Sequence, residues 1–365
     1  MTDADLRLLA LLVRDEHDGA AALLRDTCCD AARFAAFAEQ HRVAGFLWTR
    51  LEGTALGDEL PSALRDRLRA GYLRQWTKNE RLLREAERLL PGLAAAAPRH
   101  LFLKGPFLAA RFHGDIDRRA ISDLDVLVAG TDELERVDAL LVREGYRKTS
   151  LGTPQSRIVR RFAHHLTYRR DDLAVEVHWA FQQHFTFAID YAAVRDAAGT
   201  LELRGRSYAV ASDEDELVLQ CLAVFGDAQV GTFLAKSLVD VFVIARALDT
   251  TTDWERFLAA QTARGLGRIA TSVLGMTLDL FDGAAELPAL AAALGRRASE
   301  RRVRDRAAAL AFLNAGRYDL RSKLRALGLY QAPRPLSALA WIVSLPVRAA
   351  VHRDDAAAGL RDLLR

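Results

Sequence analysis

The sequence predicts a small mixed α/β core, with a helical arm before it and a helical domain after it. Three observations predict this order. Apolar residues recur at helical spacing over residues 5–90, the spacing changes to that of strands near residue 100, and it becomes helical again after residue 212. We therefore expect four segments: a helical arm at 1–98, an α/β core at 99–211, a helical domain at 212–330 and an apolar-basic tail at 331–365.

The arm is predicted to be helical throughout. Leu11 and Leu12 follow Leu8 by three and four residues, a spacing that places all three on one face of a helix. Pro61 is a favourable residue at the start of a helix. The helix that follows it is predicted from residue 64 towards residue 90.

The core is predicted to alternate short strands with helices. Strands at 101–104 and 124–128 enclose a helix at 107–112 and a polar loop at 114–122, and an amphipathic helix follows at 132–144. Two hairpins complete a small, partly antiparallel sheet, with strands at 162–169 and 173–181 and at 201–203 and 208–211.

The C-terminal part is predicted to be helical, because residues 212–215 form a helix-capping signature. Helices are expected to continue to about residue 329. Pro333 and Pro335 then separate the tail from the helical domain.

The composition is globular and excludes some classes of function. A chain of 365 residues can form two or three domains, and the values of 50% apolar and 27% charged residues are ordinary. The net charge of only +3 indicates no general affinity for polyanions. The sequence has no basic stripe with interleaved aromatic residues. It therefore disfavours polynucleotide synthesis as the activity and nucleic acid as the partner.

The sequence also favours a cytoplasmic protein. Cys28, Cys29 and Cys221 suit reduced thiols better than a disulfide framework. The N-terminus carries acids and lacks the apolar core of a signal peptide. The longest apolar stretch, residues 336–347, is too short and too interrupted to span a bilayer. The oligomeric state stays open.

Asp123 and Asp125 at the start of a strand are the most informative motif. Strand side chains alternate, so both carboxylates project from one face while Leu124 and Val126 turn to the other. Like charges this close repel, and a strand end that tolerates them often holds a divalent cation. Glu176, on a later strand, supplies a third carboxylate. The alternative is that solvated acids lie at a strand end.

A turn that could bind phosphate lies upstream of this motif. Lys104 and the amides near Gly105 follow a strand and precede a helix, where phosphate oxygens are favoured. Arg119 could neutralise the β,γ-phosphates. Surface roles for both basic residues are the alternatives. Together with the carboxylates, these are the parts of a metal-dependent phosphoryl or nucleotidyl transfer site.

Histidines accompany the third carboxylate. His178 shares a strand face with Glu176, so it could orient a metal-bound carboxylate or act as a general base. A buried structural histidine is the alternative. His164 and His165 are predicted to point in opposite directions from the adjoining strand. At most one then faces the site, and we choose His165.

With these motifs in place, the chain resembles the nucleotidyltransferase-fold superfamily, which includes DNA polymerase beta and the aminoglycoside nucleotidyltransferases. More narrowly, it resembles a poorly characterised bacterial group of nucleotidyltransferase family proteins. The resemblance rests on Leu103-Lys104-Gly105, on residues 119–128 and on residues 175–179. Residues 41–45, 236–240 and 253–254 also follow its pattern, while the last thirty match least. Lys104-Gly105 replaces the Gly-Ser turn of the wider superfamily.

The resemblance implies an activity and its participants. Asp123, Asp125 and Glu176 would hold two Mg²⁺ ions, and an NTP, expected to be ATP, would donate a nucleoside monophosphate. The acceptor would be a hydroxyl of a small molecule or peptide, as in natural-product tailoring, and pyrophosphate would leave. Lys236 and Asp240 would contact the nucleotide across a cleft; a surface ion pair is the alternative.

Two other functions stay open. One is a protein-modifying adenylyltransferase, and the other is a non-catalytic binding module of the same fold in a biosynthetic complex. Dependence on a metal separates the binding module from both enzymes, whereas only the acceptor separates the enzymes from each other.

Overall fold

The structure is a computed structural model that describes residues 2–25, 30–149, 157, 163–181, 187–230, 234–298 and 313. Structural statements below refer to these residues. The predicted tail, with Cys28 and Cys29, lies outside them, as does the start of the first predicted hairpin at residue 162.

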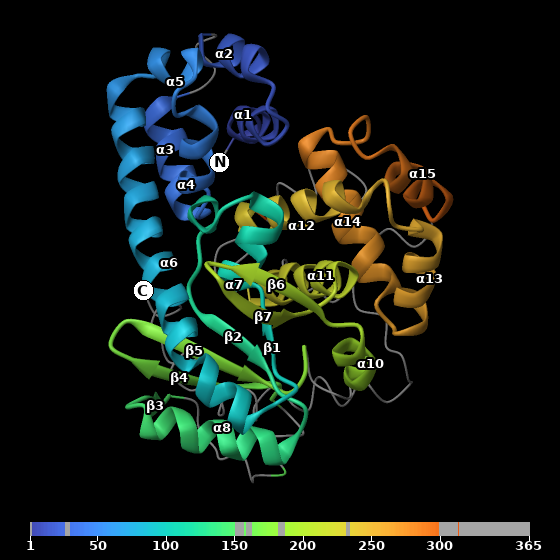
Figure 1. The fold of residues 1–365 in the computed structure, drawn as a ribbon. Coiled ribbons are helices and arrows are strands. Elements are labelled where there is room, and N and C mark those ends of the chain that lie inside the picture. Colours follow the sequence, from blue (N-terminus) through green and yellow to red (C-terminus); the bar gives the residue numbers. More distant parts are fainter. Residues whose placement is uncertain are drawn as a thin grey trace, which may run out of the picture.

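The arm is helical, as predicted. Its last helix, α6, runs along one side of the molecule from the other arm helices to the sheet (Figure 1). Pro91 lies inside α6, so the helix extends beyond the predicted end near residue 90. The arm helices are α1 (Asp3–Val13), α2 (His17–Arg25), α3 (Ala31–Gln40), α4 (Ala44–Leu51), α5 (Ala55–Glu59) and α6 (Ser62–Ala96).

The core contains one mixed sheet of seven strands in the order β3-β4-β5-β2-β1-β7-β6. At its centre β2 runs parallel to β5 and antiparallel to β1. Both predicted hairpins are present, as the antiparallel pairs β4–β5 and β6–β7. The strands are β1 (Leu101–Leu103), β2 (Leu124–Leu127), β3 (Arg147–Lys148), β4 (His165–Arg170), β5 (Leu173–His178), β6 (Gly199–Leu203) and β7 (Arg206–Val210).

The two faces of the sheet differ in chemistry. Leu124, Val126 and Val128 belong to a buried apolar cluster with side chains of α6 and of α8 (Thr131–Arg143). Asp125 and Glu176 alternate with these apolar residues and therefore lie on the opposite face. The predicted alternation across this strand is confirmed.

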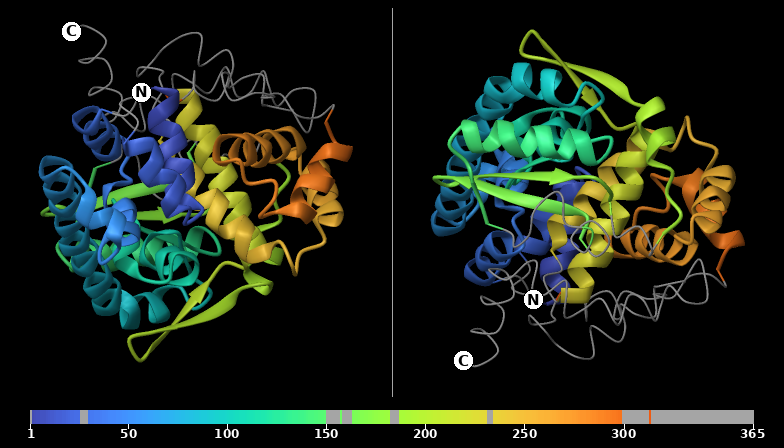
Figure 2. Two further views of the ribbon diagram at one scale, coloured as in Figure 1. Left: turned by 90° about the horizontal axis from the view of Figure 1, so that it is seen from above. Right: turned by 90° about the horizontal axis from the view of Figure 1, so that it is seen from below.

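The helices after the core cover that polar face. Here α11 and α12 pack against each other and against α14, and one buried apolar cluster joins them to arm helices and to Leu103 and Leu127. Figure 2 shows the blue arm helices lying beside the yellow and orange helices. These later helices are α11 (Asp213–Val230), α12 (Ala235–Leu248), α13 (Trp254–Ala263), α14 (Gly267–Phe281) and α15 (Pro288–Arg296), whereas α10 (Tyr191–Asp196) lies within the core, before β6.

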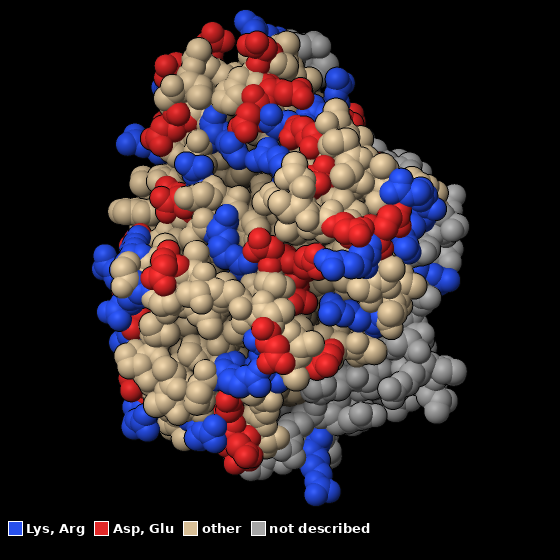
Figure 3. All heavy atoms as spheres, turned by 45° about the vertical axis from the view of Figure 1, so that its right-hand side comes forward, with Lys and Arg blue, Asp and Glu red and all other residues tan. Residues whose placement is uncertain are grey.

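Acidic and basic side chains are interspersed on the face shown in Figure 3. That face carries no continuous basic stripe. Among the described helices, none combines the length and the apolar character required to cross a membrane.

Candidate active site

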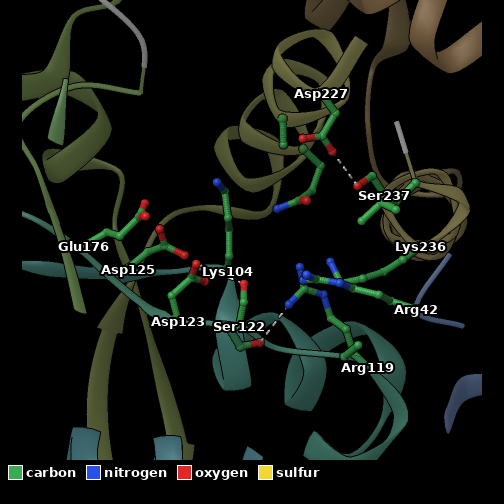
Figure 4. A pocket seen from close by; sticks show the side chains of 15 residues that line it. Arg42, Lys104, Arg119, Ser122, Asp123, Asp125, Glu176, Asp227, Lys236 and Ser237 are labelled. Atoms are coloured by element: carbon green, nitrogen blue, oxygen red, sulfur yellow. Dashed lines mark hydrogen bonds between the residues drawn. The ribbon is translucent and has the colours of Figure 1, made fainter. Parts of the chain in front are cut away.

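A polar cavity of about 190 Å³ lies where the sheet meets α11 and α12. Figure 4 shows carboxylates on one side of it and basic side chains on the other, with Lys104 between them. The cavity is lined by Arg42, Lys104, Gly105, Arg119, Ala120, Ser122, Asp123, Asp125, Glu176, Gln220, Ala223, Asp227, Leu234, Lys236 and Ser237.

Asp123, Asp125 and Glu176 form what we call the carboxylate wall. Strand register explains this grouping, because Asp125 on β2 is paired with Glu176 on β5. Asp123 lies two residues before Asp125 and lines the same cavity. The structure thus brings together the three carboxylates that the sequence predicted as metal ligands.

The carboxylate wall is electrostatically strained. Burial raises the pKa of Asp123 to about 7, and repulsion from Asp125 and Glu176 adds to this effect. Burial also opposes ionisation of Asp125, but the charge of Lys104 and a hydrogen bond from His178 outweigh it and lower the pKa of Asp125. The pKa of Asp123 is raised while those of Asp125 and Glu176 are lowered, so a bound cation would favour the ionised form of Asp123.

His178 supports the wall from β5. Its Nε2 lies 2.8 Å from Asp125 Oδ1 and 3.5 Å from Glu176 Oε2. Burial opposes protonation, but contact with the two carboxylates raises the pKa of His178 to about 9. The imidazole is thus placed to orient the two carboxylates, and a role as general base stays a prediction.

The prediction that His164 and His165 point in opposite directions is wrong. The ring of His178 lies 5.9 Å from the ring of His164 and 4.9 Å from that of His165, measured between centroids. His164 precedes the first residue of β4, so strand alternation does not apply to it. His165 Nε2 lies 3.7 Å from Glu176 Oε2, so the predicted proximity of His165 to the site is observed.

Lys104 occupies a tight turn between β1 and the short helix α7 (Gly105–Leu108). Both Lys104 (φ 46°) and Gly105 (φ 51°) have left-handed backbone conformations, which strain a residue that carries a Cβ. The Lys104 N–H donates to Glu216 Oε2 at 3.3 Å, so this amide is already bonded within the protein. Burial disfavours the charged amine, but Asp125 and Asp123 outweigh it and raise the pKa of Lys104.

Arg42, Arg119 and Lys236 form what we call the cation wall (Figure 4). They come from the turn before α4, the loop before β2 and the first turn of α12. Asp240, one helical turn after Lys236, accepts from Lys236 Nζ at 3.0 Å and from Arg119 Nε at 2.9 Å. His113 Nε2 lies 2.9 Å from the same carboxylate.

Asp240 therefore has a different place from the one predicted. Its side chain is fully buried and does not line the cavity. Asp240 therefore has neither of its two expected roles, a contact with the nucleotide or a surface ion pair. It is a positioning residue that fixes Arg119 and Lys236, both of which line the cavity as predicted. The loop that carries Arg119 is also held from α6, where Asn79 Nδ2 donates to the Arg119 carbonyl at 2.7 Å.

Arg42, Ser122 and Asp227 are among the cavity residues that the sequence analysis did not name as site residues. Arg42 follows His41, which has a structural role because its Nδ1 accepts from the Ala235 N–H at 3.3 Å. The Ser122 hydroxyl donates to Asp123 at 2.9 Å. Asp227 on α11 accepts from Ser237 at 3.3 Å, and burial raises the pKa of Asp227 to about 6. Adjacency to known motifs could have indicated Arg42 and Ser122, but nothing in the sequence marks Asp227.

The donor set fits a divalent cation. Asp125, Glu176 and His178 each offer one ligand atom, and these atoms lie within 4.8 Å of one another. Asp123 adds a fourth group whose charge the folded protein leaves incompletely balanced. Carboxylate oxygens are the ligands that Mg²⁺ prefers, with few protein ligands and substrate phosphates completing its shell.

Comparison with known protein families is consistent with this geometry. Residues 27–282 match the model of a family described as uncharacterised nucleotidyltransferase. The match begins in the arm and ends after α14, so it includes every cavity residue named above. No curated protein matches the chain.

Proposed function

The chain belongs to this family of uncharacterised nucleotidyltransferases, and we propose that it transfers a nucleoside monophosphate from an NTP to a hydroxyl group. One observation carries the proposal: a single cavity presents a carboxylate wall opposite a cation wall. A metal–triphosphate complex has the complementary pattern, because its metal binds carboxylates and its phosphates bind Arg and Lys.

Each wall has a defined task in the proposed reaction. Asp123, Asp125 and Glu176 would hold Mg²⁺, which when bound offsets the negative charge of the triphosphate. Arg119 and Lys236 bind the phosphates that leave as pyrophosphate. Asp240 and His113 keep those two cations in place, so little reorganisation is needed when the charge moves.

The proposed step is a displacement at phosphorus. The acceptor oxygen forms a bond to the α-phosphorus, and the bond from that phosphorus to the bridging oxygen breaks. The electron pair leaves with pyrophosphate, and the hydroxyl proton passes to solvent. Lys104, between the two walls, is placed to contact the phosphate chain.

The size of the cavity indicates which part of the substrate it holds. Pockets that enclose a whole ligand measure roughly 300–1,000 Å³, whereas this cavity measures about 190 Å³. It therefore suits the phosphates and the metal, and the base and the acceptor extend beyond it. We propose ATP as donor and a small molecule or peptide as acceptor, with natural-product tailoring as one setting.

The test is calorimetric titration of ATP, GTP, CTP and UTP with and without Mg²⁺. The proteins are wild type, the double variant Asp123→Ala/Asp125→Ala, and the control Asp66→Ala. Asp66 is an exposed acid on α6 that does not line the cavity. We expect Mg²⁺-dependent binding of one NTP by wild type and control, and at least about 100-fold weaker binding by the double variant, because metal coordination contributes several kcal/mol.

Two results would overturn the proposal. If wild type binds no NTP, the fold serves another donor or a non-catalytic role. If the double variant binds NTP and Mg²⁺ like wild type, the carboxylate wall is not the metal site.

A further inference from the structure

Three histidines converge beside the carboxylate wall. Ring nitrogens of His164, His165 and His178 lie within 4.8 Å of one another. Two chain segments supply them, since His164 and His165 lead into β4 and His178 ends β5. The pairing of His165 with His178 across the two strands brings the rings together.

The histidine cluster differs in chemistry from the carboxylate wall. Three imidazole nitrogens suit borderline transition-metal ions such as Zn²⁺, whereas Mg²⁺ prefers oxygen. Two nitrogens bound to one tetrahedral Zn²⁺ lie about 3.3 Å apart, so nitrogens within 4.8 Å of one another must approach by up to about 1.5 Å, which side-chain rotations can supply. Catalytic zinc sites commonly use three protein ligands and leave a fourth position open.

A second observation points to a ligand. His178 uses Nε2 to contact Asp125 and Glu176, while its Nδ1 is buried and has no hydrogen-bond partner among the described residues. An unmatched buried ring nitrogen is costly in a structural histidine, but it is the atom that a metal ligand must offer. The Nε2 contact with a carboxylate is the arrangement that commonly fixes the orientation of a metal-binding imidazole.

Glu176 connects the two sites. Its Oε2 lies 3.7 Å from His165 Nε2 and 3.5 Å from His178 Nε2, so this carboxylate lies directly against the histidine cluster. The same residue belongs to the carboxylate wall. The histidine cluster and the carboxylate wall are therefore neighbours, with Glu176 between them.

We propose that His164, His165 and His178 form a second metal site that takes a transition-metal dication such as Zn²⁺ and adjoins the carboxylate wall. The site depends on imidazole nitrogens alone and does not require that the protein transfers nucleotides. It goes beyond the proposed function, which needs only the carboxylates and Mg²⁺.

The test uses Co²⁺ as a spectroscopic substitute for Zn²⁺ on the chelator-treated full chain without nucleotide. The variants are His164→Ala and His165→Ala, with His17→Ala as a matched control on α2, away from the cavity. We expect one Co²⁺ per chain with the visible absorption of a low-coordinate, nitrogen-bound ion, displaced by Zn²⁺ but not by excess Mg²⁺. Each cluster variant should bind Co²⁺ more than about 10-fold more weakly, because mutating even a hydrogen-bond partner of a metal ligand costs about 10–100-fold in metal affinity.

A further variant, Asp123→Asn, separates this proposal from the proposed function. It removes a carboxylate expected to bind Mg²⁺ but none of the histidines, so Co²⁺ binding should persist while Mg²⁺-dependent NTP binding is lost. The histidine site is refuted if wild type binds no Co²⁺, or if His164→Ala and His165→Ala bind it as tightly as His17→Ala. It is also refuted if Asp123→Asn alone abolishes binding, because the ion would then lie on the carboxylate wall.

Discussion

The carboxylate wall comes from two neighbouring strands, whereas the cation wall comes from three segments that are far apart in the chain. On the carboxylate wall, strand register alone sets Asp125 opposite Glu176. On the cation wall, Arg119 and Lys236 meet only because both bond to Asp240, 121 and 4 residues away from them respectively.

The two walls also differ in how their charges are balanced. Asp240 is enclosed by partners that hold its pKa far below the usual range of a carboxyl group, although burial opposes this. Asp123 has the opposite shift, because burial and neighbouring carboxylates raise its pKa. Asp240 is thus fully paired, although burial and repulsion from Arg119 lower the pKa of Lys236, whereas no cation among the described residues offsets the burial of Asp123.

The largest expected effect concerns Asp240. Asp240→Asn would leave Arg119 and Lys236 buried without their counter-charge, and removing one partner of a buried ion pair typically costs about 3–5 kcal/mol. We expect a loss of this size in the free energy of unfolding, measured in urea at pH 7.5. Asp172→Asn, at an exposed acid paired with the exposed Arg81, is the control and should change it by less than about 0.5 kcal/mol. Equal stability of the two variants would contradict the comparison.

On the carboxylate wall the same kind of substitution should have the opposite sign. A raised pKa means that the folded state disfavours ionised Asp123, so its charge costs stability above pH 7 and costs nothing below about pH 4. In chelator at pH 8, Asp123→Asn should therefore raise the free energy of unfolding by about 1 kcal/mol or more, since one pKa unit corresponds to about 1.4 kcal/mol. Added Mg²⁺ should stabilise wild type but not the variant. A variant destabilised at pH 8 in chelator would show that the wall is internally balanced.

The difference between the walls explains how much the sequence could predict. Asp123 and Asp125 were predicted because alternation along a strand is a local rule, and Glu176 because it lies in a recognisable strand, whereas the pairing of β2 with β5 is not local. Arg119 was named from its loop and Lys236 through the resemblance, but their connection through Asp240 depends on how α12 docks on the core, which no local pattern encodes. Asp227 was missed for the same reason. His164 was misplaced because alternation was extended one residue beyond the strand.

A third prediction concerns Asp227, which lies among the cations near Lys236 but is not fully paired. Its pKa of about 6 is raised above the ordinary value of 3.8, chiefly by burial. Between these two values the folded state binds more protons than the unfolded state, so stability falls as pH rises. Asp227→Asn should match wild type near pH 3.5 and be more stable above pH 6, as measured by thermal unfolding across that range. A pH-independent difference would indicate that steric changes, and not charge, cause the effect.

The smallest expected effect concerns the turn that joins the walls. Lys104 has φ 46°, a conformation that costs residues with a Cβ about 1–2 kcal/mol and glycine much less. Lys104→Ala and Lys104→Gly both remove the ammonium group beside Asp125 and Asp123, so they should lose NTP binding to the same extent. They should differ in stability, with Lys104→Gly higher by about 1 kcal/mol in urea unfolding, because only alanine keeps the backbone strain. If the alanine variant is the more stable of the two, the left-handed turn is not retained without the lysine. The contact between Lys104 and the carboxylates, not the backbone conformation, would then determine the shape of this part of the site.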